Sequence, residues 1–271
     1  MYEILEWGTL ALIPLFMIGD LVIRARHFSK PRFWRLRATL VTAFTVALAT
    51  FVAVTWATIL GPLHLFDLSG LGPLWGAVVG ILVYELLHYW YHRAAHRFDW
   101  LWRNTHQMHH SAESLDAFGA YWLHPMDTVC FTTLSSLVFF PLLGLTVEAG
   151  LVGALFLTFS AMFQHANIRT PKWVGYIIQR PESHGVHHAR GVHRYNYSDL
   201  PLWDIVFGTF RNPREFESEC GFWVGASSQI GPMLMARDVS TPEDDAVFAE
   251  PPRPAVAESD TFTLFDSAYR S

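Results

Sequence analysis

Residues 84–111 read YELLHYWYHRAAHRFDWLWRNTHQMHHS, and this stretch decides the fold. It contains an HxxxH pair at 92–96 and an HxxHH triplet at 106–110, and a second HxxHH triplet follows at 184–188. On a helix, residues three or four apart lie on the same face. The clustered histidines are His92, His96, His106, His109, His110, His184, His187 and His188.

These clusters indicate metal binding. Imidazoles buried side by side are costly unless something binds them. Eight exceed the needs of one zinc ion, because a structural zinc site takes four ligands and a catalytic site three. The set contains no thiolate, so iron, zinc and copper all suit it by ligand type. We expect two metal ions, each with an open position, whereas the isolated His27 and His64 are ordinary polar residues.

The HRAAH sequence at 92–96 has the histidine spacing of a zinc protease helix. That motif requires a glutamate beside its first histidine as the general base. Arg93 occupies the position here, which disfavours peptide hydrolysis.

The composition is typical of a membrane protein. Hydrophobic residues make up 51% of the 271 residues and charged residues 16%, below the roughly 25% of soluble domains. The net charge of −5 gives no indication of a nucleic-acid partner. Cys130 and Cys220 form no CxxC motif, so a disulfide framework and a cysteine-based metal site are both disfavoured.

Hydrophobic stretches predict five membrane-spanning helices. The fourth is short for a full crossing and forms a hairpin with the fifth. The first is expected to be retained, because the acidic Glu3 and Glu6 replace the basic start of a signal peptide. The expected spans are 4–23, 38–60, 71–91, 128–143 and 147–164.

The basic segment 24–37 sets the expected orientation, because basic loops between spans mark the cytoplasmic side. The third and fifth spans return to that side and bring His92, His96 and His165 with them. We therefore expect an all-α, multi-pass bundle of about five spans, with a cytoplasmic helical cap that carries the histidine clusters.

The motifs WYHRAAH, HQMHHS, FQHANIRTP and HGVHHAR, followed by YNYSDLPLWDIVFGTF, resemble the fatty acid hydroxylase/sterol desaturase superfamily over about residues 78–212. The resemblance implies a non-haem di-iron centre with two Fe ions in a cytosolic cap. It also implies the metal ligands, which by position are His92, His96, His106, His109, His110, His165, His184, His187 and His188.

A tenth ligand stays open. Some family members have a second histidine four residues after the one that matches His165, but Arg169 stands there. His88, His193 and Asn167, acting through a water, are the candidates, whereas His124 is expected to be structural. Four carboxylates could orient ligand imidazoles or could equally be solvated or capping groups. They are Glu85, Asp99, Glu182 and Asp199.

With the resemblance, the chain divides into four parts. Residues 1–70 hold the first two spans and the basic loop, and 71–212 form a hydroxylase-like catalytic domain. Residues 213–237 complete the cap, and the acidic, proline-containing tail at 238–271 is expected to be disordered.

The expected function is hydroxylation of a lipid C–H bond with O2 and external electrons. Desaturation by the same family is the first alternative, and a zinc-dependent membrane hydrolase or a metal carrier are others. The lipid could be a sterol, fatty acyl chain, sphingolipid or carotenoid. The chain lacks a GxGxxG motif and a cysteine cluster, so a ferredoxin or cytochrome b5 type donor is expected. Basic residues beside the histidines could receive it, namely Arg93, Arg97, Arg103, Arg190 and Arg194.

Overall fold

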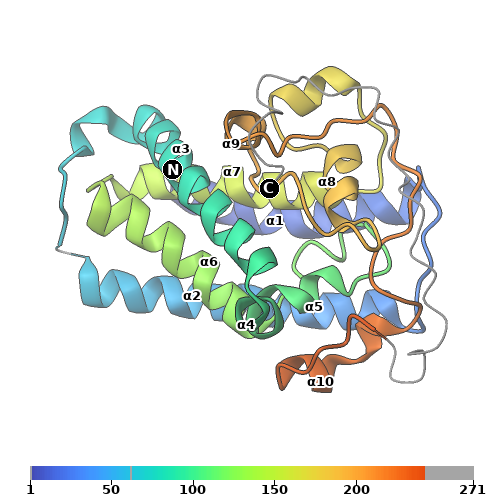
Figure 1. Ribbon diagram of the computed structural model, residues 1–271. Helices are drawn as coiled ribbons and strands as arrows, with labels where there is room; N and C mark the ends of the chain where they lie inside the picture. Colours follow the sequence, from blue (N-terminus) through green and yellow to red (C-terminus); the bar gives the residue numbers. More distant parts are fainter. Residues whose placement is uncertain (1, 62, 242–271) are drawn as a thin grey trace, which may run out of the picture.

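The computed structural model describes residues 2–61 and 63–241, which fold into helices joined by loops (Figure 1). Within these ranges there is no strand, only an isolated bridge between Ala189 and Cys220, so the predicted all-α class is confirmed. The longer helices are α1 (Tyr2–Val22), α2 (Trp34–Leu60), α3 (Gly72–Arg97), α6 (Pro125–Leu137) and α7 (Val147–His165). The shorter ones are α4 (Asp99–Leu101), α5 (Gln107–His110), α8 (Pro181–His188), α9 (Pro201–Val206) and α10 (Ile230–Leu234).

Single turns of other helix types complete the chain. Two are π-helical; one continues α4 and the other continues α6. The π-helices are η2 (Trp102–His106) and η3 (Val138–Leu142); the 3₁₀ turns are η1 (Ser69–Leu71), η4 (Lys172–Tyr176) and η5 (Ala226–Ser228).

Five helical segments are long and apolar enough to cross a membrane, as predicted. They are Tyr2–Val22, Trp34–Leu60, Ser69–Arg97, Pro125–Leu142 and Val147–His165. The third continues to Arg97, beyond the expected end at Tyr91, because no glycine or proline interrupts the sequence there. This extension places His92 and His96 on the last turns of α3.

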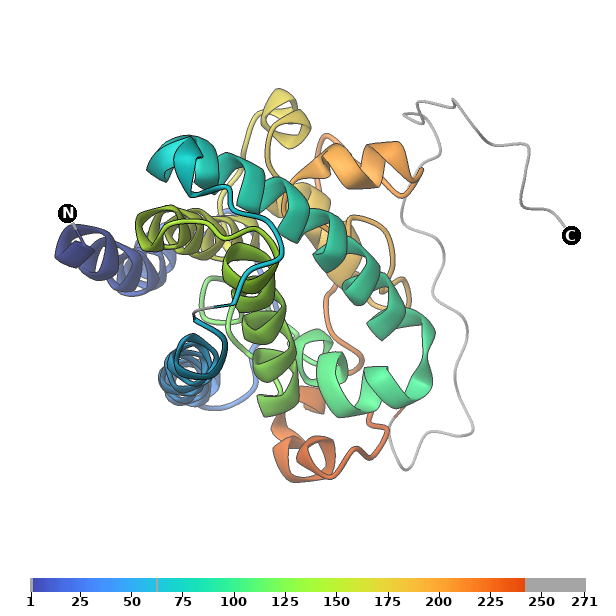
Figure 2. The same cartoon turned by 90° about the vertical axis from the view of Figure 1, so that its left-hand side faces the viewer.

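The spans pack through small residues. In Figure 2, α1 and α2 are seen nearly end on while α3 runs obliquely across the bundle, where it packs against α7. The Phe139 ring fills the space between Gly80 of α3 and Gly153 of α7. A Cβ atom at either glycine would lie 2.6 or 2.5 Å from that ring. Close helix approach at small residues is typical of membrane bundles.

Asp20, near the end of α1, fastens this helix to the loops around the histidines. Its carboxylate accepts hydrogen bonds from the backbone N–H of Ala117, at 2.6 Å, and of Asn167, at 3.0 Å. The Ala25 N–H also donates to the Asn167 carbonyl at 3.0 Å. The basic segment 24–37 therefore lies at the same end of the bundle as His165, as the expected topology requires.

The basic segment does more than carry charge. Arg26 forms a buried ion pair with Glu182 of α8, and Lys30 lies 2.9 Å from the buried Asp116 carboxylate. These pairs hold the connection between α1 and α2 against the histidine-bearing loops.

The segment 213–237 packs on α5 and extends two residues further than expected. Gln107 donates to the Arg237 carbonyl at 2.9 Å and accepts from the Val239 N–H at 2.8 Å. Val239 is buried, so the ordered chain includes the first residues of the predicted disordered tail. The rest of that tail, from 242 onward, lies outside the described residues.

Candidate metal centre

The structure brings all nine predicted ligands into two adjacent groups, in each of which one nitrogen per residue lies within 4.8 Å of the others. The five-histidine group consists of His92, His96, His106, His110 and His187. The four-histidine group consists of His109, His165, His184 and His188.

Each HxxHH triplet serves both groups. Its two neighbouring histidines are about 100° apart around the helix, so they point in different directions. His110 of α5 enters the five-histidine group and His109 the four-histidine group, and α8 divides His187 and His188 in the same way. The rings of His110 and His188 stack with centroids 4.3 Å apart, which places the groups side by side.

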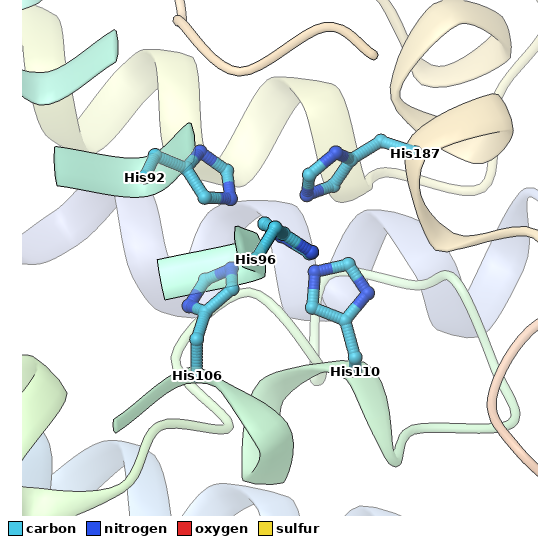
Figure 3. A group of neighbouring side chains, drawn as sticks. All are labelled: His92, His96, His106, His110 and His187. Atoms are coloured by element: carbon cyan, nitrogen blue, oxygen red, sulfur yellow. The ribbon is translucent and has the colours of Figure 1, made fainter. Parts of the chain in front are cut away.

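Hydrogen bonds turn the rings of the five-histidine group inward. The Nδ1–H groups of His92 and His187 donate to the backbone carbonyls of Tyr197, at 2.6 Å, and Tyr195, at 2.7 Å. Their Nε2 atoms are then free to bind at the centre of the group, around which the five rings lie in Figure 3. Among the described residues, no hydrogen-bond partner exists for any of the five buried Nε2 atoms.

In the four-histidine group the Nε2 atoms approach one another. His165 Nε2 lies 3.2 Å from His109 Nε2 and 3.1 Å from His184 Nε2, and His184 Nε2 lies 3.0 Å from His188 Nε2. Neighbouring ligands on one ion have about this spacing when the metal–nitrogen distance is about 2.1 Å. Both groups therefore fit a bound metal.

The protonation states agree with this interpretation. Burial, followed by the charges of neighbouring imidazoles, lowers the pKa of five histidines outside the spans well below the ordinary value. Their rings are therefore neutral near pH 7, the form that binds a metal. These residues are His109, His110, His184, His187 and His188.

Asp127 is a site residue that the sequence reasoning missed. Its Oδ2 accepts a hydrogen bond from His106 Nδ1 at 2.7 Å, and its Oδ1 accepts one from the Tyr91 hydroxyl at 2.9 Å. Carboxylates behind metal-binding histidines fix the tautomer and raise ligand basicity. Asp127 follows His106 by 21 residues, so no local spacing links the two.

Among the described residues, no hydrogen bond or ion pair joins the four predicted carboxylates to the nine histidines. Glu182 binds Arg26, Arg180 and the Thr170 hydroxyl, and the exposed Asp99 binds Arg103 at 2.8 Å. These two therefore match the alternative of structural or solvated groups. Glu85 and Asp199 instead form a third buried group with His88, in which one atom per residue lies within 4.8 Å of the others.

The candidates for a tenth ligand lie outside both groups. His193 Nδ1 is 3.0 Å from His110 Nδ1, so its ring lies behind that of His110, and His88 stacks on His92 with centroids 5.5 Å apart. The Asn167 amide is occupied by the backbone of Arg26, to which it donates at 2.8 Å and from which it accepts at 2.9 Å.

His124 is structural, as expected. Its Nδ1 accepts a hydrogen bond from the Met126 N–H at 3.1 Å and so caps the start of α6.

A cavity of about 290 Å³ leads from the histidines into the membrane-spanning part of the bundle. His106 and His109 form part of its wall, other polar residues such as His88, Gln164 and Asp199 line it too, and small or apolar residues of the spans contribute a further part. Among the latter are Ala49 of α2, Phe131 of α6, and Ala154, Leu157 and Ala161 of α7.

Comparisons with known proteins agree with the geometry. The fatty acid hydroxylase family model matches residues 77–209. An alkylglycerol monooxygenase of Danio rerio is 34% identical over 143 residues, covering 50% of this chain and 30% of that protein. Sphinganine C4-monooxygenase 1 of Arabidopsis thaliana is 24% identical over 137 residues, covering 49% of this chain and 53% of that protein.

A very-long-chain aldehyde decarbonylase of Oryza sativa subsp. indica is 27% identical over 140 residues, covering 49% of this chain and 53% of that protein. The chain thus spans about half or less of the length of these relatives. No solved structure matches the chain.

Proposed function

From the chain's membership of the fatty acid hydroxylase family, shown by residues 77–209, we propose that it is a membrane-bound di-iron oxygenase that hydroxylates a lipid C–H bond. The observation that carries the proposal is the pair of adjacent histidine groups. Their inward-facing nitrogens offer five and four ligands to two neighbouring ions. When bound, two irons supply the dioxygen chemistry needed to break an unactivated C–H bond.

The protein residues provide the setting for this chemistry. The carbonyls of Tyr195 and Tyr197 and the carboxylate of Asp127 hold the imidazoles in the metal-binding tautomer. The cavity receives an apolar chain from the membrane-spanning part of the bundle and excludes bulk water from the bond that reacts. A lipid substrate also agrees with the relatives, whose names specify sphinganine, alkylglycerol and very-long-chain aldehydes.

The five spanning helices and the family identify an integral membrane protein. We place the histidine groups on the cytoplasmic side. The support is the basic segment 24–37, which lies at their end of the bundle and contacts Asn167 and Glu182.

Electrons come from a separate donor of the ferredoxin or cytochrome b5 type in this proposal. Arg97 and Arg194 are exposed and suit an acidic partner. The other candidate arginines form hydrogen bonds or ion pairs: Arg93 donates to Tyr89, Arg103 pairs with Asp99, and Arg190 pairs with Glu219. Arg194 lies over the Tyr195 ring, 4.9 Å from its centroid.

Desaturation remains the alternative at the same site, because both reactions begin with abstraction of hydrogen from a C–H bond. Reconstitution of the iron-loaded chain with a reductase and donor under labelled dioxygen separates the two. One labelled oxygen in the lipid product supports hydroxylation, whereas a new double bond with label only in water identifies desaturation. Full turnover with one zinc per chain and no iron rejects the di-iron proposal.

A further inference from the structure

Glu85, His88 and Asp199 form a polar group that the two histidine groups do not use. All three side chains are buried. Glu85 Oε1 and His88 Nδ1 have no hydrogen-bond partner among the described residues. The distance of 3.7 Å between His88 Nδ1 and Glu85 Oε2 is too long for a hydrogen bond. Buried polar atoms left in this way are costly, so the site is built to receive another group.

Part of this polar group is structural. Glu85 Oε2 accepts hydrogen bonds from the backbone N–H of Asp199, at 2.8 Å, and of Leu200, at 3.3 Å. These bonds attach the loop before α9 to the middle of α3. The second oxygen of Glu85 and the ring nitrogen of His88 take no part in them, so the attachment does not explain the whole group.

The group borders the cavity that leads to the histidines. His88 and Asp199 line its wall, together with Gln164, whose amide donates to Asp199 at 2.9 Å. Phe131 and Ala161 line the same cavity, and the Phe131 ring lies edge-on against the His88 ring. His88 and Asp199 are thus on the cavity wall, with Glu85 directly behind them, and the His88 ring stacks on that of His92.

The group has a surplus of acceptors. Ionised carboxylates accept hydrogen bonds and cannot donate them. Burial, and then the neighbouring Glu85 carboxylate, raise the pKa of Asp199 to about 7. A ligand that donates hydrogen bonds would satisfy the free acceptors and stabilise both carboxylates.

We propose that Glu85, His88 and Asp199 bind the polar end of the lipid substrate through a hydrogen-bond-donating hydroxyl or amine. This inference rests on the proposed lipid oxygenase function and adds the chemistry by which the substrate is held. His88 and His92 are one helical turn apart, roughly 6 Å along α3, a length that an alkyl chain spans in about five bonds. The C–H bond that reacts therefore lies within about five carbons of the polar end.

The test compares three probes of equal chain length, hexadecanol, hexadecylamine and hexadecyl methyl ether, which lacks a donor. Binding to the metal-loaded full chain in detergent is measured by displacement of a fluorescent lipid. We expect the alcohol or the amine to bind at least about tenfold more tightly than the ether. In Asp199→Asn and His88→Phe this preference falls to near unity, with the metal content unchanged.

Thr132→Val is the matched control, because Thr132 lines the same cavity on α6 and lies outside the polar group. The control keeps the preference for a donor. If the chain prefers the amine and Asp199→Asn removes that preference, the polar end of the substrate is an ammonium group. If the chain prefers the alcohol, the polar end is a hydroxyl. Equal affinity of the wild-type chain for all three probes overturns the proposal, as does a third metal ion per chain that Asp199→Asn removes.

Turnover adds an independent readout, because binding does not require dioxygen. Oxygen placed within about five carbons of the polar end supports the inference, and oxidation at the far methyl end overturns it. A chain that prefers the donor probes but incorporates no labelled oxygen retains this binding site and rejects the oxygenase function. A chain that oxidises lipids without any donor preference rejects this binding site alone.

Discussion

Asp127 Oδ2 lies 2.7 Å from His106 Nδ1, where α6 begins beside the five-histidine group. The same carboxylate accepts from Tyr91 near the end of α3, so it connects α3 and α6 to the His106 ring. The position of the His106 ring therefore depends on a helix that contributes none of the nine histidines.

Asp127→Asn is expected to weaken metal retention by about 10- to 100-fold, because a neutral amide supports the imidazole less well than a carboxylate. Metal content per chain, measured across a series of chelator concentrations, gives the change. Asp99→Asn is the control, since Asp99 is exposed and binds only Arg103 among the described residues. Equal retention by both variants would remove Asp127 from the support of the metal.

His187→Ala and His109→Ala are each expected to abolish turnover while the protein still inserts into the membrane. Each removes one nitrogen from a different group, so each should lower the metal content at one site before the other. Metal analysis of the purified variants checks this, with two irons expected in the wild type. His64→Ala, in an exposed loop, should leave both metal and turnover unchanged. Near-normal product from either ligand variant would exclude that residue from the centre.

Glu182→Gln is expected to destabilise the protein by about 3–5 kcal/mol, because Arg26 and Arg180 would lose their buried partner. Thermal unfolding in detergent measures the loss. Glu219→Gln breaks a largely exposed pair with Arg190 and should cost at most about 1 kcal/mol. Similar losses of stability in the two variants would show that the buried ion pairs of Glu182 stabilise the protein no more than the exposed pair of Glu219.

Gly80→Ala is expected to cost about 1–3 kcal/mol, because the new methyl group would lie against the Phe139 ring. Adding Phe139→Leu should recover part of the loss by making room between α3 and α7. Gly19→Ala on α1 is the control, since a Cβ there meets nothing within 4 Å. The measurement is the free energy of unfolding of the wild type, the two single glycine variants and the double variant. If the double variant recovers none of the lost stability, the packing argument is wrong.

Reporter fusions test the orientation. A reporter after His64, between the second and third spans, should lie outside, and one after Asp238 should lie inside. Five crossings require opposite sides, with the histidine groups inside. The same side for both reporters would disprove the crossing count.

Much of this architecture follows from local sequence. Hydropathy predicts the five spans because each buries its own backbone polar groups within one segment. The HxxxH and HxxHH spacings predict shared helix faces, and the structure indeed gathers these histidines. His165 is predicted as a ligand only from the family resemblance, because no other histidine lies near it in the sequence.

Other features depend on contacts between distant segments, and the sequence does not reveal them. The assignment of His109 and His110 to different groups requires α7 and α8 to be in place. The π-helical turn η2, which precedes this pair, has no sequence signature that distinguishes it from α-helix. Asp127 and the Tyr195 carbonyl orient rings on other elements, and no periodicity connects them to those rings.

The hydrogen bonds from Ala117 and Asn167 to Asp20 determine how short a fragment of this protein can be without losing support for its histidine groups. Residues 77–209 carry the family likeness, yet α1 and α2 lie before them, and Asp20 and Arg26 support the loops that hold the histidines. A fragment cut to the region of similarity would leave two loop N–H groups and a buried Glu182 without these partners. The matched residues 77–209 are thus fewer than the residues that hold the histidine groups in place, and a fragment that keeps these contacts has to begin at α1.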